Sequence, residues 1–417
     1  MRTKWTKEEK SWILYDVANS AFIMLIATII PIYLDTLIPE GASNTVYMGY
    51  TTTIVTLLVA VLGPILGAIS DNTKKKMQIF FTTVLIGVIA CILLSIPMSY
   101  MGFLVVFAIA KLGANSSFIF YDSMLVDITT EDNMDNISAQ GYACGYIGSC
   151  IPFICCLLLV LYSQTENPLI GFQLAMSISF IVTGLWWLIL TLPLVKNYKQ
   201  KGSENSGSIK DSFKELLNTF KEIVQTKHIL IFIIAFFFYI DAVYTIIDLA
   251  TSYGKDLGLG TTDLLIALLV TQIVAFPCSL FFGMLSKKVK VNKLLLVCII
   301  AYTVIAMVAV FMTTTTMFWI LAVLVGMFQG AIQALTRSYF TKIVPQEKTA
   351  SYFALLDICG KGSSALGTFL VSTITVLTGS PTNGIIVLPV MMVIGLVLYL
   401  VSDKLYNNYK SENGVSE

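Results

Sequence analysis

The chain has 417 residues, of which 56% are hydrophobic and 12% are charged, and its mean hydropathy is +0.82. Soluble domains carry about 25% charged residues, so the composition excludes a soluble enzyme or binding domain and predicts an integral membrane protein. The formal net charge is +1 at pH 7, which provides no basic field to attract nucleic acid. We therefore expect a lipid bilayer around the chain and no nucleic-acid partner.

No motif in the chain indicates an enzyme, a metal site or a cofactor site. The eight cysteines lie in apolar segments without a CxxC pair, and histidine occurs once, at His228, whereas zinc sites usually combine the two residue types. The segment Gly360-Lys361-Gly-Ser lacks the glycine at position 355 and the preceding strand that a phosphate-binding loop requires. HExxH and GxSxG motifs are absent. We expect a protein that is not an enzyme and that holds no metal or cofactor.

Twelve apolar segments are long enough to cross a bilayer. A helix needs about 20 largely apolar residues to span about 30 Å of hydrocarbon. Cutting the chain where charged residues, Pro, Gly and Asn cluster leaves spans at 12–37, 46–69, 77–97, 101–121, 138–162, 169–195, 228–250, 262–285, 294–313, 316–336, 350–378 and 383–403. The first span has no A-x-A cleavage site, so we expect it to be retained. The predicted fold is an all-α integral membrane protein with 12 transmembrane helices.

The lysine and arginine residues predict which side of the membrane each loop faces, since they collect in short cytoplasmic loops. Of the 26 Lys and Arg residues, only Lys255 falls on the side opposite the termini, and Lys111 and Lys361 lie within spans. Both termini are therefore expected in the cytoplasm. The loop 122–136 is expected on that same side, yet its charges are all acidic, which the rule does not explain.

A polar segment divides the spans six and six. Residues 197–227 begin rich in Gly, Ser and Lys and end in an amphipathic helical pattern. We expect this segment to be a basic cytoplasmic linker. It would join an N-terminal six-helix bundle, residues 1–196, to a C-terminal six-helix bundle, residues 228–405, and residues 406–417 would form a cytoplasmic tail. Two related six-helix bundles joined in this way are the arrangement of major facilitator transporters.

The loop after the second span is partly repeated after the eighth. Gly67-Ala-Ile-Ser-Asp71-Asn-Thr-Lys-Lys75-Lys resembles the major facilitator loop signature G-x-x-x-D-x-x-G-R-[KR], and its Gly, Ser and first Lys recur at an offset of 216 residues. The resemblance implies that Asp71 and Lys75 belong to a conformational latch between the halves, and that Gly67 permits close helix approach. The alternative is that the lysines at 74–76 only follow the cytoplasmic bias of positive charge.

Charged and amide side chains within the spans mark the expected pathway of a solute and a coupling ion. A charge at the centre of a membrane helix costs about 2.5–3.5 kcal/mol unless it is paired or hydrated. The candidates are Asp16, Asn19, Lys111, Asn115, Asp241, Asp248, Gln272, Gln329, Gln333, Arg337, Asp357 and Lys361. Asp16 and Asp241 lie in spans related by the repeat, so we expect them to face a common cavity as solute or proton sites. Gln329, Gln333 and Arg337 recur every four residues and therefore share one helix face.

Pairing within the protein is the alternative for several of these residues. Asp357 and Lys361 are spaced i, i+4 and can neutralise each other on one helix. Lys111 has no acid within its own span, so it must pair across helices or bind an anion. Asp248 lies near the outer end of its span, as a gate or as a solvated residue. Arg337 lies near the cytoplasmic end, so its alternative role is that of a positive charge on the cytoplasmic side or of an ion pair between the two halves.

Several strings resemble the vacuolar amino-acid effluxer-like branch of the major facilitator superfamily, also described as autophagy-related permease-like. Tyr15-Asp-Val-Ala-Asn-Ser is similar to the opening signature of this branch, which commonly has Trp at the third position. Gly141-Tyr-Ala-Cys-Gly-Tyr-Ile-Gly is similar to its fifth-span motif, and Gln329-Gly-Ala-Ile-Gln-Ala-Leu-Thr-Arg to a later one. Asp241 is followed by Ala where the branch usually has Gly. The resemblance covers nearly the whole chain.

The resemblance implies a secondary transporter that works by alternating access, with fungal relatives that release leucine, isoleucine and tyrosine from the vacuole. The richness in Lys, Ile and Asn suggests a bacterial member in the cell membrane. We expect it to export an amino acid and to be coupled to an ion, with the proton as the candidate. The alternatives are an exporter of drugs, sugars or peptides with the same fold, and a non-transporting sensor or scaffold. We expect no obligate protein partner.

Overall fold

The computed structural model describes residues 5–73, 75–130, 134–200, 218, 220–286, 288–345 and 349–413. All regular secondary structure in these residues is helical, which confirms the predicted all-α class. The N-terminal elements are α1 (Lys7–Ala27), α2 (Ile29–Asp35), α3 (Asn44–Thr73), α4 (Lys76–Leu93), α5 (Tyr100–Ile128), α6 (Met134–Tyr162) and α7 (Phe172–Asn197). The C-terminal elements are α9 (Lys227–Asp256), α10 (Thr261–Leu285), α11 (Val291–Val310), α12 (Thr315–Ile343), α13 (Thr349–Thr378), α14 (Pro381–Ile385) and α15 (Val387–Asn413).

Twelve spans are predicted from the sequence, and the helices account for them. Eleven helical stretches in the described part of the chain are long and apolar enough to cross a membrane. The twelfth is α13, a helix of 30 residues whose described apolar part is Ala365–Thr378. The first span is interrupted at Thr28, which leaves helical geometry and donates its hydroxyl to the carbonyl oxygen of Met24 at 2.5 Å. Pro31 follows within α2 and has no backbone N–H to continue the helical ladder.

Short polar residues begin several of the spans. Thr6 and Glu9 form a capping box at the start of α1, where each side chain accepts a hydrogen bond from the backbone N–H of the other. Ser99 accepts from the backbone N–H of Gly102 at the start of α5 at 3.3 Å. Thr314 caps α12 in the same way. These caps satisfy backbone donors that the helices leave unpaired at their ends.

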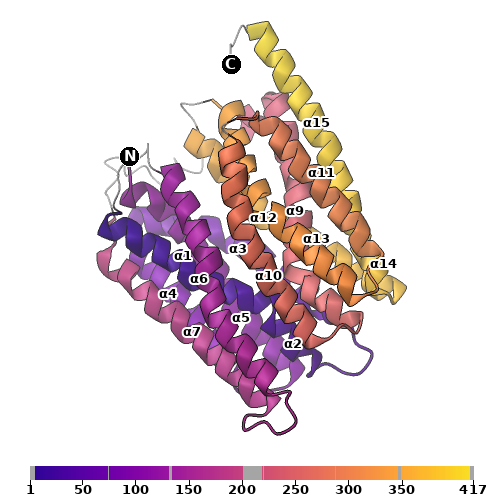
Figure 1. The fold of residues 1–417 in the computed structure, drawn as a ribbon. Helices are drawn as coiled ribbons and strands as arrows, with labels where there is room; N and C mark the ends of the chain where they lie inside the picture. The colour runs from indigo at the N-terminus through magenta and orange to yellow at the C-terminus, as the bar shows by residue number, and fades with distance from the viewer. Residues whose placement is uncertain are drawn as a thin grey trace.

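The helices form two groups that lie side by side in Figure 1, with α1–α7 in one and α9–α15 in the other. The start of α1 and the end of α15 lie at the same end of the molecule, and the opposite end is called the distal end below. The long helix α7 ends at residue 197, and α9 begins at residue 227. These positions are the limits of the predicted linker. The last helix, α15, continues to Asn413, well into the predicted tail.

Glycines permit close approach between neighbouring helices within each half. A Cβ atom on Gly113 of α5 would lie 2.6 Å from the backbone nitrogen of Gly87 in α4. A Cβ atom on Gly326 of α12 would lie 2.6 Å from the carbonyl oxygen of Thr271 in α10. Such small residues increase van der Waals contact between membrane helices, for which lipid offers no hydrophobic driving force.

One acid of the acidic loop 122–136 is neutralised within the N-terminal half. The carboxylate of Asp127 lies 3.5 Å from the ammonium of Lys76 at the start of α4. The hydroxyl of Tyr198, which follows α7, also donates to Asp127. Both Lys76 and Asp127 are buried. Asp127, an acid on the side where positive charge is expected, therefore links the end of α5 to the start of α4 and to the residue that follows α7.

Candidate functional site

A seam of hydroxyl side chains joins α3 of the first half to α13 of the second. The hydroxyls of Thr53 and Thr368 lie 2.8 Å apart. Nearer the distal end, the hydroxyls of Tyr50 and Thr373 lie 3.2 Å apart. Gly49 lets the helices meet, since a Cβ atom there would lie 3.0 Å from the carbonyl oxygen of Thr368. The two halves are therefore in direct contact through the distal part of α3 and α13.

The seam ends in a helix cap that crosses from one half to the other. Asp256, the last residue of α9, accepts from the backbone N–H groups of Asn44 and Thr45 at 2.6 and 2.9 Å and from the hydroxyl of Ser43 at 2.6 Å. These groups form the N-terminus of α3, where a carboxylate is favoured by the unpaired donors and by the helix dipole. The neighbouring Lys255 pairs with Asp35 of α2 at 3.0 Å. None of these contacts is predicted from the sequence.

Lys111 and Asp248 form an ion pair between the two halves, within membrane-spanning helices. The Nζ atom of Lys111, on α5, lies 3.2 Å from Oδ2 of Asp248, on α9. Nζ also donates to the hydroxyl of Thr52 on α3 at 3.1 Å. The side chain of Lys111 is 5% exposed and that of Asp248 is 21% exposed. Lys111 thus has a partner across helices, which is one of the two alternatives that the sequence left open.

Asp241 is fully buried in the second half and contacts α13. Its carboxylate accepts from the backbone N–H of Gly367 at 3.0 Å and from the hydroxyl of Thr245 at 3.2 Å. A Cβ atom on Gly367 would lie 2.5 Å from Oδ1 of Asp241. Glycine at this position is therefore what allows the carboxylate to reach the backbone of α13.

Asp16 and Asn19 face other helices of the first half. Asp16 lies against α6, where a Cβ atom on Gly141 would be 3.0 Å from its Oδ2 atom. Asn19 is fully buried and donates to the hydroxyl of Tyr15 at 3.3 Å, and that hydroxyl lies 2.6 Å from Ser117 Oγ. The Oδ1 atom of Asn19 has no partner among the described residues. Asp16 and Asp241 thus contact different helices, α6 and α13.

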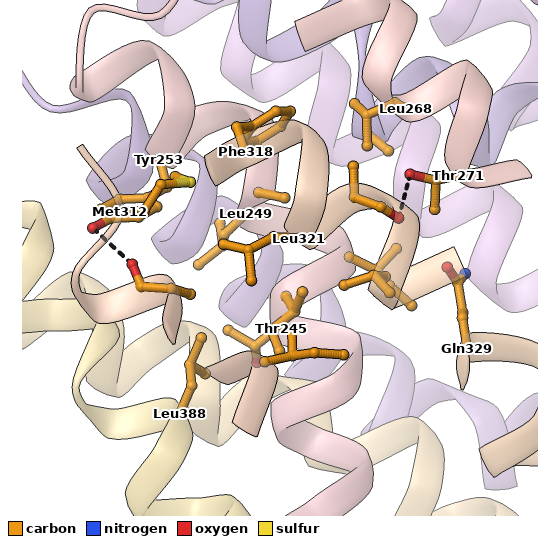
Figure 2. Close-up of a pocket in the computed structure, with 18 of the residues that line it drawn as sticks. Thr245, Leu249, Tyr253, Leu268, Thr271, Met312, Phe318, Leu321, Gln329 and Leu388 are labelled. Atoms are coloured by element: carbon orange, nitrogen blue, oxygen red, sulfur yellow. Dashed lines mark hydrogen bonds between the residues drawn. The ribbon is translucent and has the colours of Figure 1, made fainter. Parts of the chain in front are cut away.

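A cavity of about 90 Å³ lies among the helices of the second half. Figure 2 shows its wall, which is largely apolar and includes Leu249, Phe318 and Leu321 from α9 and α12. Met24 and Ala27 of α1 complete the lining. Its polar members are Thr245, Tyr253, Thr271, Gln272 and Gln329. The hydroxyls of Thr271 and Tyr253 donate to backbone carbonyl oxygens of Ala322 and Ala309 at 3.0 and 3.4 Å.

The cavity contains some of the residues expected to line the pathway. Gln272 and Gln329 contribute to its wall. Gln333, one turn from Gln329, is half-buried and lies outside the lining. Arg337, at the end of the same polar stripe, is exposed and lies over the ring of Tyr142 of α6 at 5.3 Å, a cation–π contact between the halves. The stripe on α12 therefore runs from the cavity to the end of the molecule where α1 starts and α15 ends.

Other candidate residues have less structural definition. Asn115 is half-buried on α5, and Lys75 is exposed just before α4. Gly67 and Asp71 lie near the end of α3, and Asp357 and Lys361 lie within α13. The side chains of these last four positions fall outside the described residues. Among the residues that are described, no group of three His, Cys, Asp or Glu side chains is placed to hold a metal ion.

Comparison with known proteins places the chain in a family. The family described as vacuole effluxer Atg22 like matches residues 42–405. The chain belongs to this family. It is 40% identical over 407 residues to the uncharacterized MFS-type transporter YxiO of Bacillus subtilis, a match that covers 95% of each chain. It is 26% identical over 305 residues to autophagy-related protein 22 of Kluyveromyces lactis, which covers 67% of this chain and 59% of that one.

Solved structures confirm the fold that the sequence predicts. The nucleoside transporter NupG matches with a TM-score of 0.67 and 14% identity, covering 96% of this chain and 99% of that one. A bacterial homolog of the human lysosomal transporter Spinster matches with a TM-score of 0.62 and 16% identity, covering 96% and 95%. This fold and the 40% identity to an MFS-type transporter show that the chain is a multi-pass membrane transporter of the major facilitator type. The family is described as an effluxer and the Bacillus subtilis relative is named as a transporter, and neither is named as an enzyme.

Proposed function

We propose that this Atg22-like protein exports amino acids with apolar side chains across the bacterial cell membrane by alternating access. Its membership of an effluxer family carries the proposal. The positive charge near the termini favours a cytoplasmic location for them, so the distal end would face outside. The contacts of Asp256 and of Lys255 with the first half would then close the outer side, and the described conformation would be closed to the outside.

The cavity supports a solute with an apolar side chain. Binding pockets for small molecules combine a mostly apolar wall with a few polar groups that orient the ligand. Here the hydroxyls of Thr271 and Tyr253 already donate to backbone carbonyls, whereas the amides of Gln272 and Gln329 provide further polar groups at the wall. A leucine or isoleucine side chain would bury its methyl groups against such a surface at a gain of about 0.8 kcal/mol per CH₂.

Export requires the distal contacts to break and the opposite end to close. Water can replace the hydrogen bonds at both places. The hydroxyl pair of Thr53 and Thr368 costs only about 0.5–1.5 kcal/mol net to open, whereas each hydrogen bond to the carboxylate of Asp256 costs about 1.5–3 kcal/mol. Asp71 and Lys75 would hold the opposite end in the alternative state. Asp16 and Asp241 are the carboxylates through which a proton gradient would be coupled.

Inside-out membrane vesicles test the direction of transport and its coupling. In these vesicles export becomes accumulation, so vesicles that contain the protein and are acidified inside are expected to accumulate labelled leucine, isoleucine or tyrosine at least fivefold over vesicles without it. Collapse of the proton gradient is expected to remove the excess. Accumulation of none of the three amino acids would contradict amino-acid export.

A further inference from the structure

We propose that Lys111 and Asp248 bind the two charged groups of an α-amino acid, and that the bound zwitterion replaces the ion pair that the two residues form with each other. The ammonium of Lys111 would receive the carboxylate of the solute, and the carboxylate of Asp248 would receive its ammonium. The inference rests on the proposed amino-acid export and adds to it a recognition site that neither the family nor the relatives specify.

The ion pair joins the two halves within membrane-spanning helices, where Lys111 has little access to water. Lys111 belongs to α5 and Asp248 to α9, and their charged atoms lie 3.2 Å apart. Lys111 is almost completely buried, and the hydroxyl of Thr52 accepts from its ammonium at 3.1 Å. Removing one partner from such a pair is destabilising, because it leaves an uncompensated charge.

Movement of the halves therefore creates a need for substitute charges. When α5 and α9 separate, both Lys111 and Asp248 lose their partner within a membrane-spanning region. A zwitterionic amino acid carries an ammonium and a carboxylate on one carbon and can neutralise both residues at once. An amine or a carboxylic acid alone neutralises only one of them. The site thus favours a solute that has both charges.

Asp248 is partly exposed, and its neighbours on α9 line the apolar cavity. Asp248 keeps 21% of its side chain exposed, and Lys111 contacts it through its Oδ2 atom. Thr245, one helical turn before Asp248 on α9, lines the cavity. Residues three apart on a helix are neighbours on its surface. Neither Lys111 nor Asp248 lines the cavity itself, so a leucine molecule with its charged end at the ion pair would extend past Thr245 to place its side chain there.

Competition binding with matched ligands tests the proposal. Purified full-length protein is incubated with labelled L-leucine and competed with unlabelled leucine, with 3-methylbutylamine, which lacks the carboxylate, or with 4-methylpentanoate, which lacks the ammonium. The wild type is expected to prefer leucine at least tenfold over both analogues. In Lys111→Met the preference over the amine is expected to fall below threefold, and in Asp248→Asn the preference over the acid is expected to fall likewise.

A double variant and a matched control separate binding from folding. Lys111→Met with Asp248→Leu leaves no unpaired charge, so the protein should fold, and leucine affinity is expected to fall at least tenfold. The control is Lys76→Met with Asp127→Leu, which removes a buried ion pair at the start of α4 within the first half and is expected to bind leucine within twofold of the wild type.

The outcomes distinguish this inference from the proposed function. A double variant of Lys111 and Asp248 that binds leucine within twofold of the wild type and still prefers it over both analogues would overturn the inference, while amino-acid transport would stand. Wild-type protein that neither binds nor transports any amino acid would overturn both. If the single variants unfold, the double variant is the decisive measurement. Thermal melting in detergent checks that the double variant is folded.

Discussion

Thr53→Cys combined with Thr368→Cys is expected to stop transport under oxidising conditions and to recover it on reduction. The two hydroxyl oxygens lie 2.8 Å apart across the seam between α3 and α13, so the cysteine sulfurs would be close enough to bond. A covalent bridge at this seam would prevent the halves from separating at the distal end. Counterflow in proteoliposomes, before and after reduction, measures the effect in protein whose eight native cysteines are replaced by serine.

The single variants are the controls for this cross-link. Thr53→Cys alone and Thr368→Cys alone are expected to transport at a rate within threefold of the cysteine-free parent, and to respond to neither oxidation nor reduction. The cross-linked fraction is measured by mass spectrometry of the peptides that contain positions 53 and 368. Transport at the parental rate by fully cross-linked protein would contradict alternating access through this seam.

Asp241→Asn is expected to fold like the wild type but to reduce counterflow at least tenfold. The amide oxygen can still accept from the N–H of Gly367, and the amide nitrogen can donate to Thr245. The substitution removes the ionisable group and reverses the hydrogen bond that orients Thr245, whose side chain lines the cavity. Melting temperature and counterflow, measured on the same preparation, separate the two effects.

Asp241→Leu is the comparison that measures the structural contribution of this residue. It leaves the hydroxyl of Thr245 buried without its acceptor and places a branched side chain against Gly367, where space is limited. An unpaired buried polar group costs about 1–3 kcal/mol, so the variant is expected to melt several degrees below the wild type. Counterflow within twofold of the wild type in Asp241→Asn would contradict a role for the ionisable group in transport.

The overall fold could be predicted because hydropathy reports membrane spans directly. In a bilayer each span must satisfy its own backbone hydrogen bonds, so an apolar run of about 20 residues becomes a helix whatever its neighbours are. Local detail within a span is less accessible. The interruption at Thr28 depends on the hydrogen bond from its hydroxyl to the carbonyl oxygen of Met24 and on Pro31. Thr28 and Pro31 stand within an apolar run, so the hydropathy of the sequence indicates one continuous span.

The partners of individual charges could not be predicted in the same way. Sequence analysis identified Lys111 as a charge that needed a partner, but which spans face each other depends on the rotation and stacking of helices far apart in the chain. Asp248 is on α9 of the other half. The cap at the start of α3 is a clearer example, since Asp256 lies 212 residues from Asn44. The polar run Ser43-Asn44-Thr45 could have indicated a helix start, but nothing local indicates the carboxylate that binds there.

A polar stripe also has limits as a guide to a cavity. Gln329, Gln333 and Arg337 share one face of a helix, as their spacing predicts, yet the surroundings of this face differ along its length. Gln329 lies at the cavity, whereas Arg337 lies beside Tyr142 near the C-terminal end of α12. Helical periodicity defines a direction around the axis and carries no information about depth.

Counterflow with the purified wild-type protein tests the central claim most directly. Proteoliposomes are loaded with a mixture of the amino acids, placed in buffer that contains the same amino acids in trace labelled form, and analysed by mass spectrometry. The account predicts that leucine, isoleucine or tyrosine accumulates at least tenfold over liposomes without protein, whereas acidic and basic amino acids do not. Accumulation of no amino acid, by protein that melts cooperatively in detergent, would contradict an amino-acid carrier.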